Sequence, residues 1–133
     1  MATGIENLKI YNLARNLEFK VHNLTKSFPK DERFRSVDQL NRSASSVTNN
    51  IAEAYYKKSA KEKIRILRNI AITEAEETRT NLIRCAEKGF FDVMLGENIS
   101  NQYIELRKTT FGYIKFLQKY IDKSAELINS STD

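Results

Sequence analysis

Apolar residues recur every three or four positions along almost the whole chain, and this spacing is the strongest constraint on the fold. Residues spaced in this way share one face of an α-helix, whereas no segment shows the strict alternation of a half-buried strand. The 133 residues include one proline and four glycines, so few positions interrupt the pattern. We therefore predict an all-α protein, an antiparallel up-down four-helix bundle that forms one domain. Its boundaries are 1–133, with helices at about 5–28, 37–57, 60–88 and 93–128.

Local residues mark where each predicted helix begins and ends. Pro29 ends the first helix because proline cannot donate a backbone hydrogen bond. Ser36 and Ser59 are each followed three residues later by Gln or Glu, a spacing typical of a capping box at a helix N-terminus. Gly89 can adopt the left-handed conformation that ends many helices, and Asp92 can cap the helix that follows.

The positive charge of the chain is concentrated in one segment. The net charge is +5, and the stretch from Tyr55 to Thr73 alone holds six basic residues and one acidic residue. No apolar run is long enough to span a membrane, and no N-terminal stretch resembles a secretory signal. The single Cys85 cannot form an internal disulfide. These features predict a cytoplasmic protein without a membrane partner.

The sequence lacks the motifs of catalytic and metal sites. A di-metal site in a helical bundle needs Glu-x-x-His on two helices, but His22 is the only histidine and has no acid three residues before it. Zinc needs three or four ligands, and His22 and Cys85 have no third partner. Carboxylate pairs such as Glu74 and Glu77 are more often solvated than catalytic. We therefore expect no enzymatic activity, no metal and no cofactor.

Polar residues interrupt the apolar pattern of the second predicted helix. The amides of two adjacent Asn residues and a nearby Glu meet at one edge of the apolar stripe, where an unpaired buried amide costs about 1–3 kcal/mol. Partners on the third helix would make this group a hydrogen-bonded strut between helices two and three. The alternative is a small polar binding site. The predicted cluster consists of Asn49, Asn50, Glu53 and Glu77.

Aromatic rings and positive charges occur together at the junction of the second and third predicted helices, and we call this group the basic corner. Lys and Arg can contact phosphates, and aromatic rings can stack on unpaired bases. The corner therefore predicts non-sequence-specific binding of RNA or DNA. The alternative is a solvated helix start that only keeps the protein soluble. The corner consists of Tyr55, Tyr56, Lys57, Lys58, Lys61, Lys63, Arg65 and Arg68.

The fourth predicted helix carries two apolar stripes, and one small bundle needs only one of them. An apolar face left over on an outer helix indicates a partner. We predict that the second stripe forms an interface between copies of the chain or docks another protein, unless the bundle core is wide enough to bury it. This stripe consists of Ile104, Phe111, Ile114 and Ile121.

One segment resembles the signature of a known family. A Ser-x-x-x-Asn-Ile-Ala-Glu stretch is followed by a basic-Ser corner and an aliphatic–Arg run that ends in Ala. The matching residues are Ser46, Asn50, Ile51, Ala52, Glu53, Lys58, Ser59, Lys61, Glu62, Ile64, Arg65, Leu67 and Ala71, with Glu77 and Leu82 further on. This pattern resembles the bacterial four helix bundle proteins, whose founding members are encoded in intervening sequences of 23S rRNA genes. The sequence departs from that pattern at Ala54 (usually Gly), Lys63 (usually aromatic) and Thr73-Glu74 (usually Gly-Ser).

The resemblance implies an assembly and a set of partners. It implies a bundle that often forms a ring-like homopentamer. A distantly related branch, the accessory variability proteins of diversity-generating retroelements, implies nucleic acid and a reverse transcriptase as partners. For the intervening-sequence branch the resemblance implies no molecular activity. Two hypotheses therefore stand: a nucleic-acid-binding oligomer, and a structural assembly or adaptor protein that binds another protein and has no nucleic-acid role.

Overall fold

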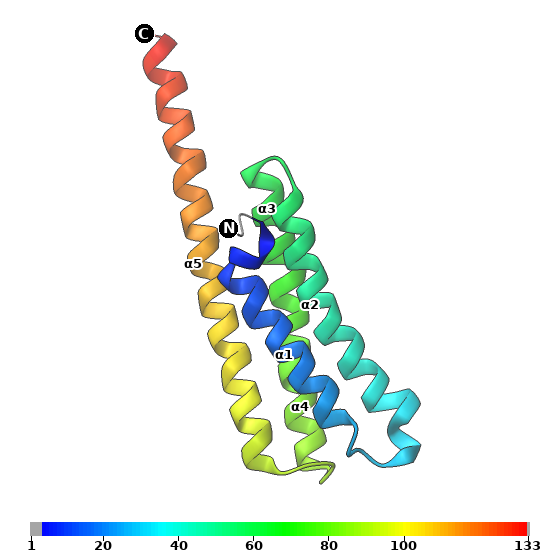
Figure 1. Ribbon diagram of the computed structural model, residues 1–133. Coiled ribbons are helices and arrows are strands. Elements are labelled where there is room, and N and C mark those ends of the chain that lie inside the picture. Colours follow the sequence, from blue (N-terminus) through cyan, green and yellow to red (C-terminus); the bar gives the residue numbers. More distant parts are fainter. Residues whose placement is uncertain (1–3, 133) are drawn as a thin grey trace.

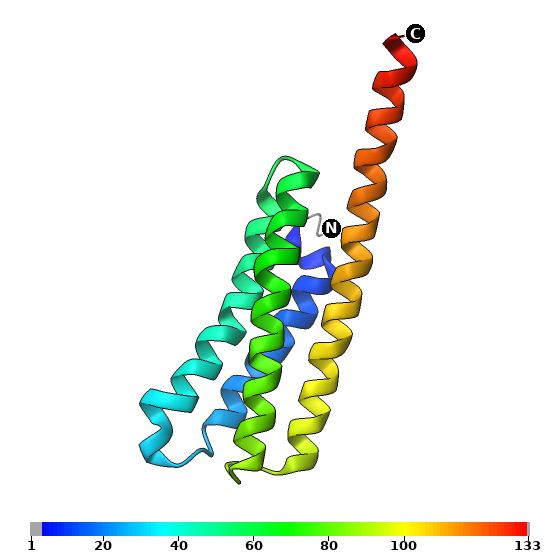
Figure 2. The same ribbon diagram turned by 180° about the vertical axis from the view of Figure 1, so that it is seen from behind.

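The computed structural model describes residues 4–132, with side chains up to residue 128. These residues are almost entirely helical and include no strand, which confirms the all-α class. Four long helical segments lie side by side (Figure 1), and the view from behind shows the same arrangement (Figure 2). They are α1 (Lys9–Thr25), α2 (Asp38–Tyr56), the continuous run of α3 (Ala60–Ile66), η4 (Leu67–Ala71) and α4 (Ile72–Glu87), and α5 (Val93–Thr132).

The four segments enclose one core. α1 packs against α2 and α5, and α4 packs against the same two helices. Apolar residues at the predicted three- and four-residue spacing supply most of the buried side chains of this core. These include Ile10, Leu17, Val21, Leu40, Ala44, Val47, Ile51, Leu67, Ala71, Ala75, Leu82, Ile99, Tyr103 and Leu106.

The first connection differs from its prediction. α1 ends at Thr25, not Phe28, and the short helices η2 (Lys30–Glu32) and η3 (Arg33–Val37) lead directly into α2. The predicted capping box at Ser36 is therefore wrong, because the chain is already helical before this residue. Ser36 instead donates its hydroxyl to Glu32 Oε2 at 2.8 Å, and its N–H donates to the same oxygen at 3.4 Å. The Ser36 hydroxyl, more than any other group, lowers the pKa of the Glu32 carboxyl.

The other three predicted helix ends are present. The Ser59 hydroxyl accepts from the Glu62 N–H at 3.1 Å and caps α3. Gly89 has φ of +82°, and the Phe90 N–H donates to the Cys85 carbonyl across it, which is the Schellman motif. Asp92 Oδ1 accepts from the Met94 N–H at 3.4 Å at the start of α5.

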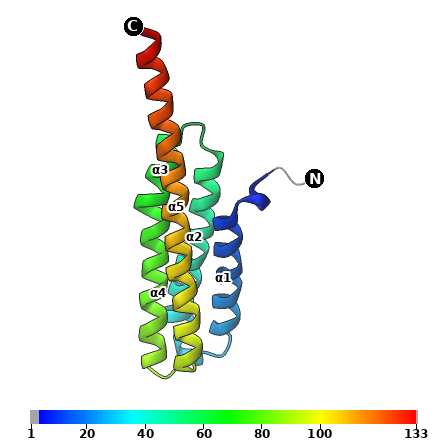
Figure 3. The same ribbon diagram turned by 90° about the vertical axis from the view of Figure 1, so that its left-hand side faces the viewer.

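α5 is longer than predicted and longer than its neighbours. It continues to Thr132 instead of ending near residue 128, and its C-terminal part projects beyond the rest of the molecule (Figure 3). From residue 118 to 128 every side chain is exposed except Ile121, which is half-buried. We call residues 118–132 the C-terminal arm.

Candidate nucleic-acid interface

The basic corner lies at the α2–α3 connection, at the end of the bundle opposite the other two connections (Figure 1). α2 ends at Tyr56, Lys57 is extended, and Ser59 starts α3, so three residues turn the chain. Lys61, Arg65 and Arg68 follow at helical spacing and lie on one exposed face of α3 and η4. The local sequence therefore brings the cations of the loop and of this helix face together.

The Lys63 side chain is half-buried and packs against the end of α2. Its ammonium donates to the Tyr55 carbonyl at 2.5 Å and to the Ala54 carbonyl at 3.3 Å, which are among the last carbonyls of α2. A cation at this position satisfies carbonyls that have no partner within the helix and favours the helix dipole. Burial lowers the pKa of the Lys63 amine. The prediction that Lys63 contacts nucleic acid directly conflicts with these contacts.

Three other cations of the corner are exposed and unpaired. Lys58, Lys61 and Arg68 form no ion pair with any residue in the part of the chain that the structure describes. The remaining two have long contacts to carboxylates on their own helices, Lys57 to Glu53 at 3.9 Å and Arg65 to Glu62 at 3.8 Å. Such surface pairs contribute little and exchange readily with a competing anion.

The two tyrosines of the corner differ in exposure. The rings of Tyr55 and Tyr56 contact each other edge-on, with their centroids 5.1 Å apart. Tyr55 is half-buried and has the Lys63 ammonium 5.5 Å from its ring centre. Tyr56 is 70% exposed, so its ring is the one open to stacking by an unpaired base.

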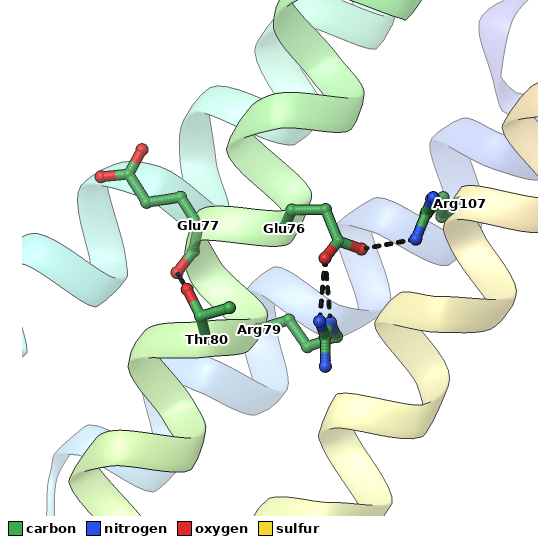
Figure 4. A network of polar contacts seen from close by, with 5 residues as sticks. All are labelled: Glu76, Glu77, Arg79, Thr80 and Arg107. Atoms are coloured by element: carbon green, nitrogen blue, oxygen red, sulfur yellow. Dashed lines mark hydrogen bonds and ion pairs between the residues drawn. The ribbon is translucent and has the colours of Figure 1, made fainter.

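The predicted polar strut between helices two and three does not form. Asn50 donates within its own helix, to the carbonyl and hydroxyl of Ser46 at 2.8 and 3.0 Å. Asn49 and Glu53 are exposed, and the Glu77 carboxylate points away from its neighbours (Figure 4). Asn49, Asn50 and Glu53 instead line an open polar groove along the outer face of α2.

Other residues link α4 to its neighbours. The Thr78 hydroxyl donates to Ser43 Oγ at 2.7 Å in the buried interface between α2 and α4. Between α4 and α5, Glu76 accepts from Arg79 at 2.9 Å and lies 3.5 Å from Arg107 (Figure 4). No sequence spacing distinguishes Ser43 and Thr78 from the other small residues on their helices.

The residues of the predicted interface on α5 differ in how far they are buried. Ile114 is 2% exposed and belongs to the core of its own chain, so it does not belong to an outward-facing stripe. Ile104 and Ile121 are half-buried, and Phe111 is 36% exposed beside Arg107. Other exposed apolar residues lie further along α5, at Phe116, Tyr120 and Leu127, which are 62%, 65% and 64% exposed.

The residues considered for catalysis or metal binding are apart from one another. His22 is exposed on α1, and Cys85 is buried near the end of α4, where burial raises the pKa of its thiol. Within residues 4–128 no group of three His, Cys, Asp or Glu side chains is placed to hold a metal ion. None of the helices described has an apolar stretch long enough to cross a membrane.

Residues 6–112 match the family described as 23S rRNA-intervening sequence protein, which is most of the chain. The chain belongs to this family. A crystal structure of a Bacteroides thetaiotaomicron protein of unknown function from the S23 ribosomal protein family superposes with a TM-score of 0.72 at 28% identity. The alignment covers 80% of this chain and 98% of that one. No curated protein matches the chain.

The fold accommodates the departures from the family pattern. Thr73 is exposed and Glu74 is half-buried, so their larger side chains do not keep the neighbouring helices apart. Ala54, at the usual glycine position, is 1% exposed within the core. Lys63, at a usual aromatic position, caps α2 as described above. The family match ends at residue 112, so the C-terminal arm lies outside it.

Proposed function

We propose that this member of the 23S rRNA-intervening sequence protein family binds RNA or DNA, without sequence specificity, through the basic corner. The observation that carries the proposal is the unpaired, exposed group of Lys58, Lys61 and Arg68 next to the exposed ring of Tyr56. Unpaired cations lose no ion pair when they contact phosphate, and each contact releases counterions from the nucleic acid. The proposal includes no catalytic step.

Assembly strengthens such a site. In this proposal the antiparallel up-down bundle predicted from the sequence is the subunit of a ring-like homo-oligomer, a pentamer by family resemblance. A ring repeats the basic corner once per subunit, so contacts that are weak singly act together on one nucleic-acid molecule. The name of the family associates its members with intervening sequences of 23S rRNA, which favours RNA as the first ligand to test.

The test is a fluorescence-anisotropy titration of structured RNA at low and moderate salt. Replacing Lys58, Lys61 and Arg68 by Gln is expected to weaken binding at low salt and to lower the slope of log affinity against log salt by about 2–3 per bound subunit. A control variant with Lys9, Lys26 and Lys108 changed to Gln has the same net charge and changes exposed residues elsewhere. Equal weakening by both variants, or no binding by the unmodified protein at low salt, contradicts the proposal.

A second candidate is a structural assembly or adaptor that docks another protein and has no nucleic-acid role. The observation that favours it is the exposed apolar surface of Phe116, Tyr120 and Leu127 on the last part of α5. Under this alternative, changes in the basic corner have no effect and polar substitutions on α5 disrupt partner capture.

A further inference from the structure

A row of aromatic rings continues from the basic corner onto α5. At the end of α2, the ring centroids of Tyr55 and Tyr56 are 5.1 Å apart. On α5, the rings of Tyr113 and Phe116 are stacked, with their planes 21° apart and their centroids separated by 6.2 Å. α3, which follows Tyr56 after the turn, packs against α5. We call these four residues the aromatic row.

The two ring pairs meet at Tyr55 and Tyr113. Burial raises the pKa of the Tyr113 phenol, and the Tyr55 phenol raises it further. The second effect acts at short range, so the two hydroxyl groups are neighbours. Both tyrosines are half-buried, whereas Tyr56 and Phe116, at the two ends of this series of contacts, are 70% and 62% exposed. The row therefore presents two open rings, each in contact with a packed one.

Cations lie beside both ends of the row. At the corner they are the unpaired side chains described above. On α5, Lys115 directly precedes Phe116, and Lys119 follows it by three residues, which makes Lys119 its neighbour on the helix surface. Both lysines are exposed, and neither forms an ion pair with any residue that the structure describes. Residues 109–121 include no Asp or Glu, so this part of α5 favours an anionic ligand.

Exposed rings next to unpaired cations suit a single strand better than a duplex. In a duplex the faces of the bases are stacked on one another, so only the backbone reaches the protein. Unpaired bases expose their faces, and each base that stacks on an aromatic side chain adds affinity whatever its sequence. Lysines contribute to the binding of either form through the phosphates. The aromatic row therefore distinguishes the two forms, and the cations do not.

We propose that the ligand of this protein is single-stranded nucleic acid, and that its path runs from the basic corner along the aromatic row to Lys115 and Lys119 on α5. Bases stack on the open rings of Tyr56 and Phe116, and phosphates contact the lysines beside them. This inference rests on the proposed function and adds to it the single-stranded form of the ligand and a second contact surface on α5.

The experiment compares two labelled RNAs by fluorescence anisotropy, a short oligouridine and a fully paired duplex of the same length. The unmodified protein is expected to bind the oligouridine more tightly. Tyr56→Ala with Phe116→Ala is expected to weaken oligouridine binding about tenfold or more and to change duplex binding by less than about twofold. The matched control, Phe19→Ala with Phe34→Ala, also removes two exposed rings and is expected to leave both affinities unchanged.

Two further measurements place the strand on α5. Lys115→Gln with Lys119→Gln is expected to lower the slope of log affinity against log salt for oligouridine by about 1–1.5 per bound subunit. Lys9→Gln with Lys26→Gln changes the net charge equally and should leave the slope unchanged. The chain has no tryptophan, so Phe116→Trp introduces a single indole, whose fluorescence oligouridine is expected to quench and the duplex is not.

The outcomes separate this inference from the proposed function. Equal weakening of both RNAs by the Tyr56/Phe116 variant overturns the inference, because a duplex does not stack on the rings. A lower mass of that variant in native mass spectrometry with unchanged oligouridine affinity also overturns it and assigns the row to a contact between proteins. Duplex binding as tight as oligouridine binding overturns the single-stranded form and leaves the proposed function standing. No binding of either RNA removes both.

Discussion

At the scale of single residues, the polar link between α2 and α4 consists of two small hydroxyl groups. The Thr78 hydroxyl donates to Ser43 Oγ, and the Ser43 hydroxyl donates to the Leu40 carbonyl at 3.2 Å. Both residues are at most 5% exposed, so water does not compete for these bonds. The Asn and Glu residues expected to do this work are on the surface or bonded within their own helix, and therefore contribute little to holding the two helices together.

Replacing Thr78 by Val is expected to lower the free energy of unfolding by about 1–3 kcal/mol, because Ser43 loses a buried partner. Replacing Glu77 by Gln is the control and is expected to change it by no more than about 0.5 kcal/mol, because this side chain is exposed. Urea unfolding measures both. A double variant with Ser43→Ala should show a coupling of about 0.5 kcal/mol or more. Additive effects of Thr78→Val and Ser43→Ala would contradict a link between these two hydroxyls. A large loss of stability in Glu77→Gln would favour the predicted strut instead.

At the scale of helices, two glycines in similar open surroundings have opposite roles. An added Cβ at Gly89 or at Gly112 would meet no atom within 4 Å. Gly89 has a positive φ and ends α4, whereas Gly112 lies within α5 at an ordinary helical conformation. Backbone conformation alone therefore separates the two positions.

Gly89→Ala is expected to destabilise the protein by about 1–2 kcal/mol, because the left-handed conformation strains any residue with a Cβ. Gly112→Ala is expected to stabilise it by about 0.5–1 kcal/mol, because alanine is the better helix former. Thermal unfolding of the two variants beside the unmodified protein measures the difference. Gly89→Asn should cost less than Gly89→Ala, and a neutral Gly89→Ala would mean that the helix end rearranges.

The sequence predicts the helices well because their information is local. Apolar spacing, Pro29, Ser59 and Gly89 each act within one or two turns, and the structure has helices between them. The cap at Glu32 was missed because this residue precedes the apolar pattern and reaches four residues forward. The role of Lys63 was missed because it depends on how the corner folds back onto α2. Hydrogen-bond partners and exposure depend on tertiary contacts, which spacing does not encode.

At the scale of the whole molecule, the length of α5 determines which of its apolar residues are covered. At 1.5 Å per residue its 40 residues extend about 60 Å, whereas the run from α3 through α4 extends about 42 Å. The C-terminal arm therefore passes the end of its neighbours (Figure 3). Apolar spacing is the same along covered and uncovered parts of a helix, so the spacing alone does not show that Tyr120 is exposed.

The arm gives the final prediction, which concerns assembly. If copies of the chain associate through this part of α5, replacing Tyr120 and Leu127 by Glu should lower the mass seen by native mass spectrometry. Lys119→Glu with Lys123→Glu places the same two new carboxylates at lysine positions of the arm and should leave the mass unchanged. If ring assembly multiplies the contacts of the basic corner, the Tyr120/Leu127 variant should also bind RNA more weakly, although the corner itself is unaltered. A lower mass with unchanged RNA affinity would mean that each subunit binds RNA alone. An unchanged mass would place the subunit interface elsewhere, with the half-buried Ile104 and the exposed Phe111 as the next positions to substitute.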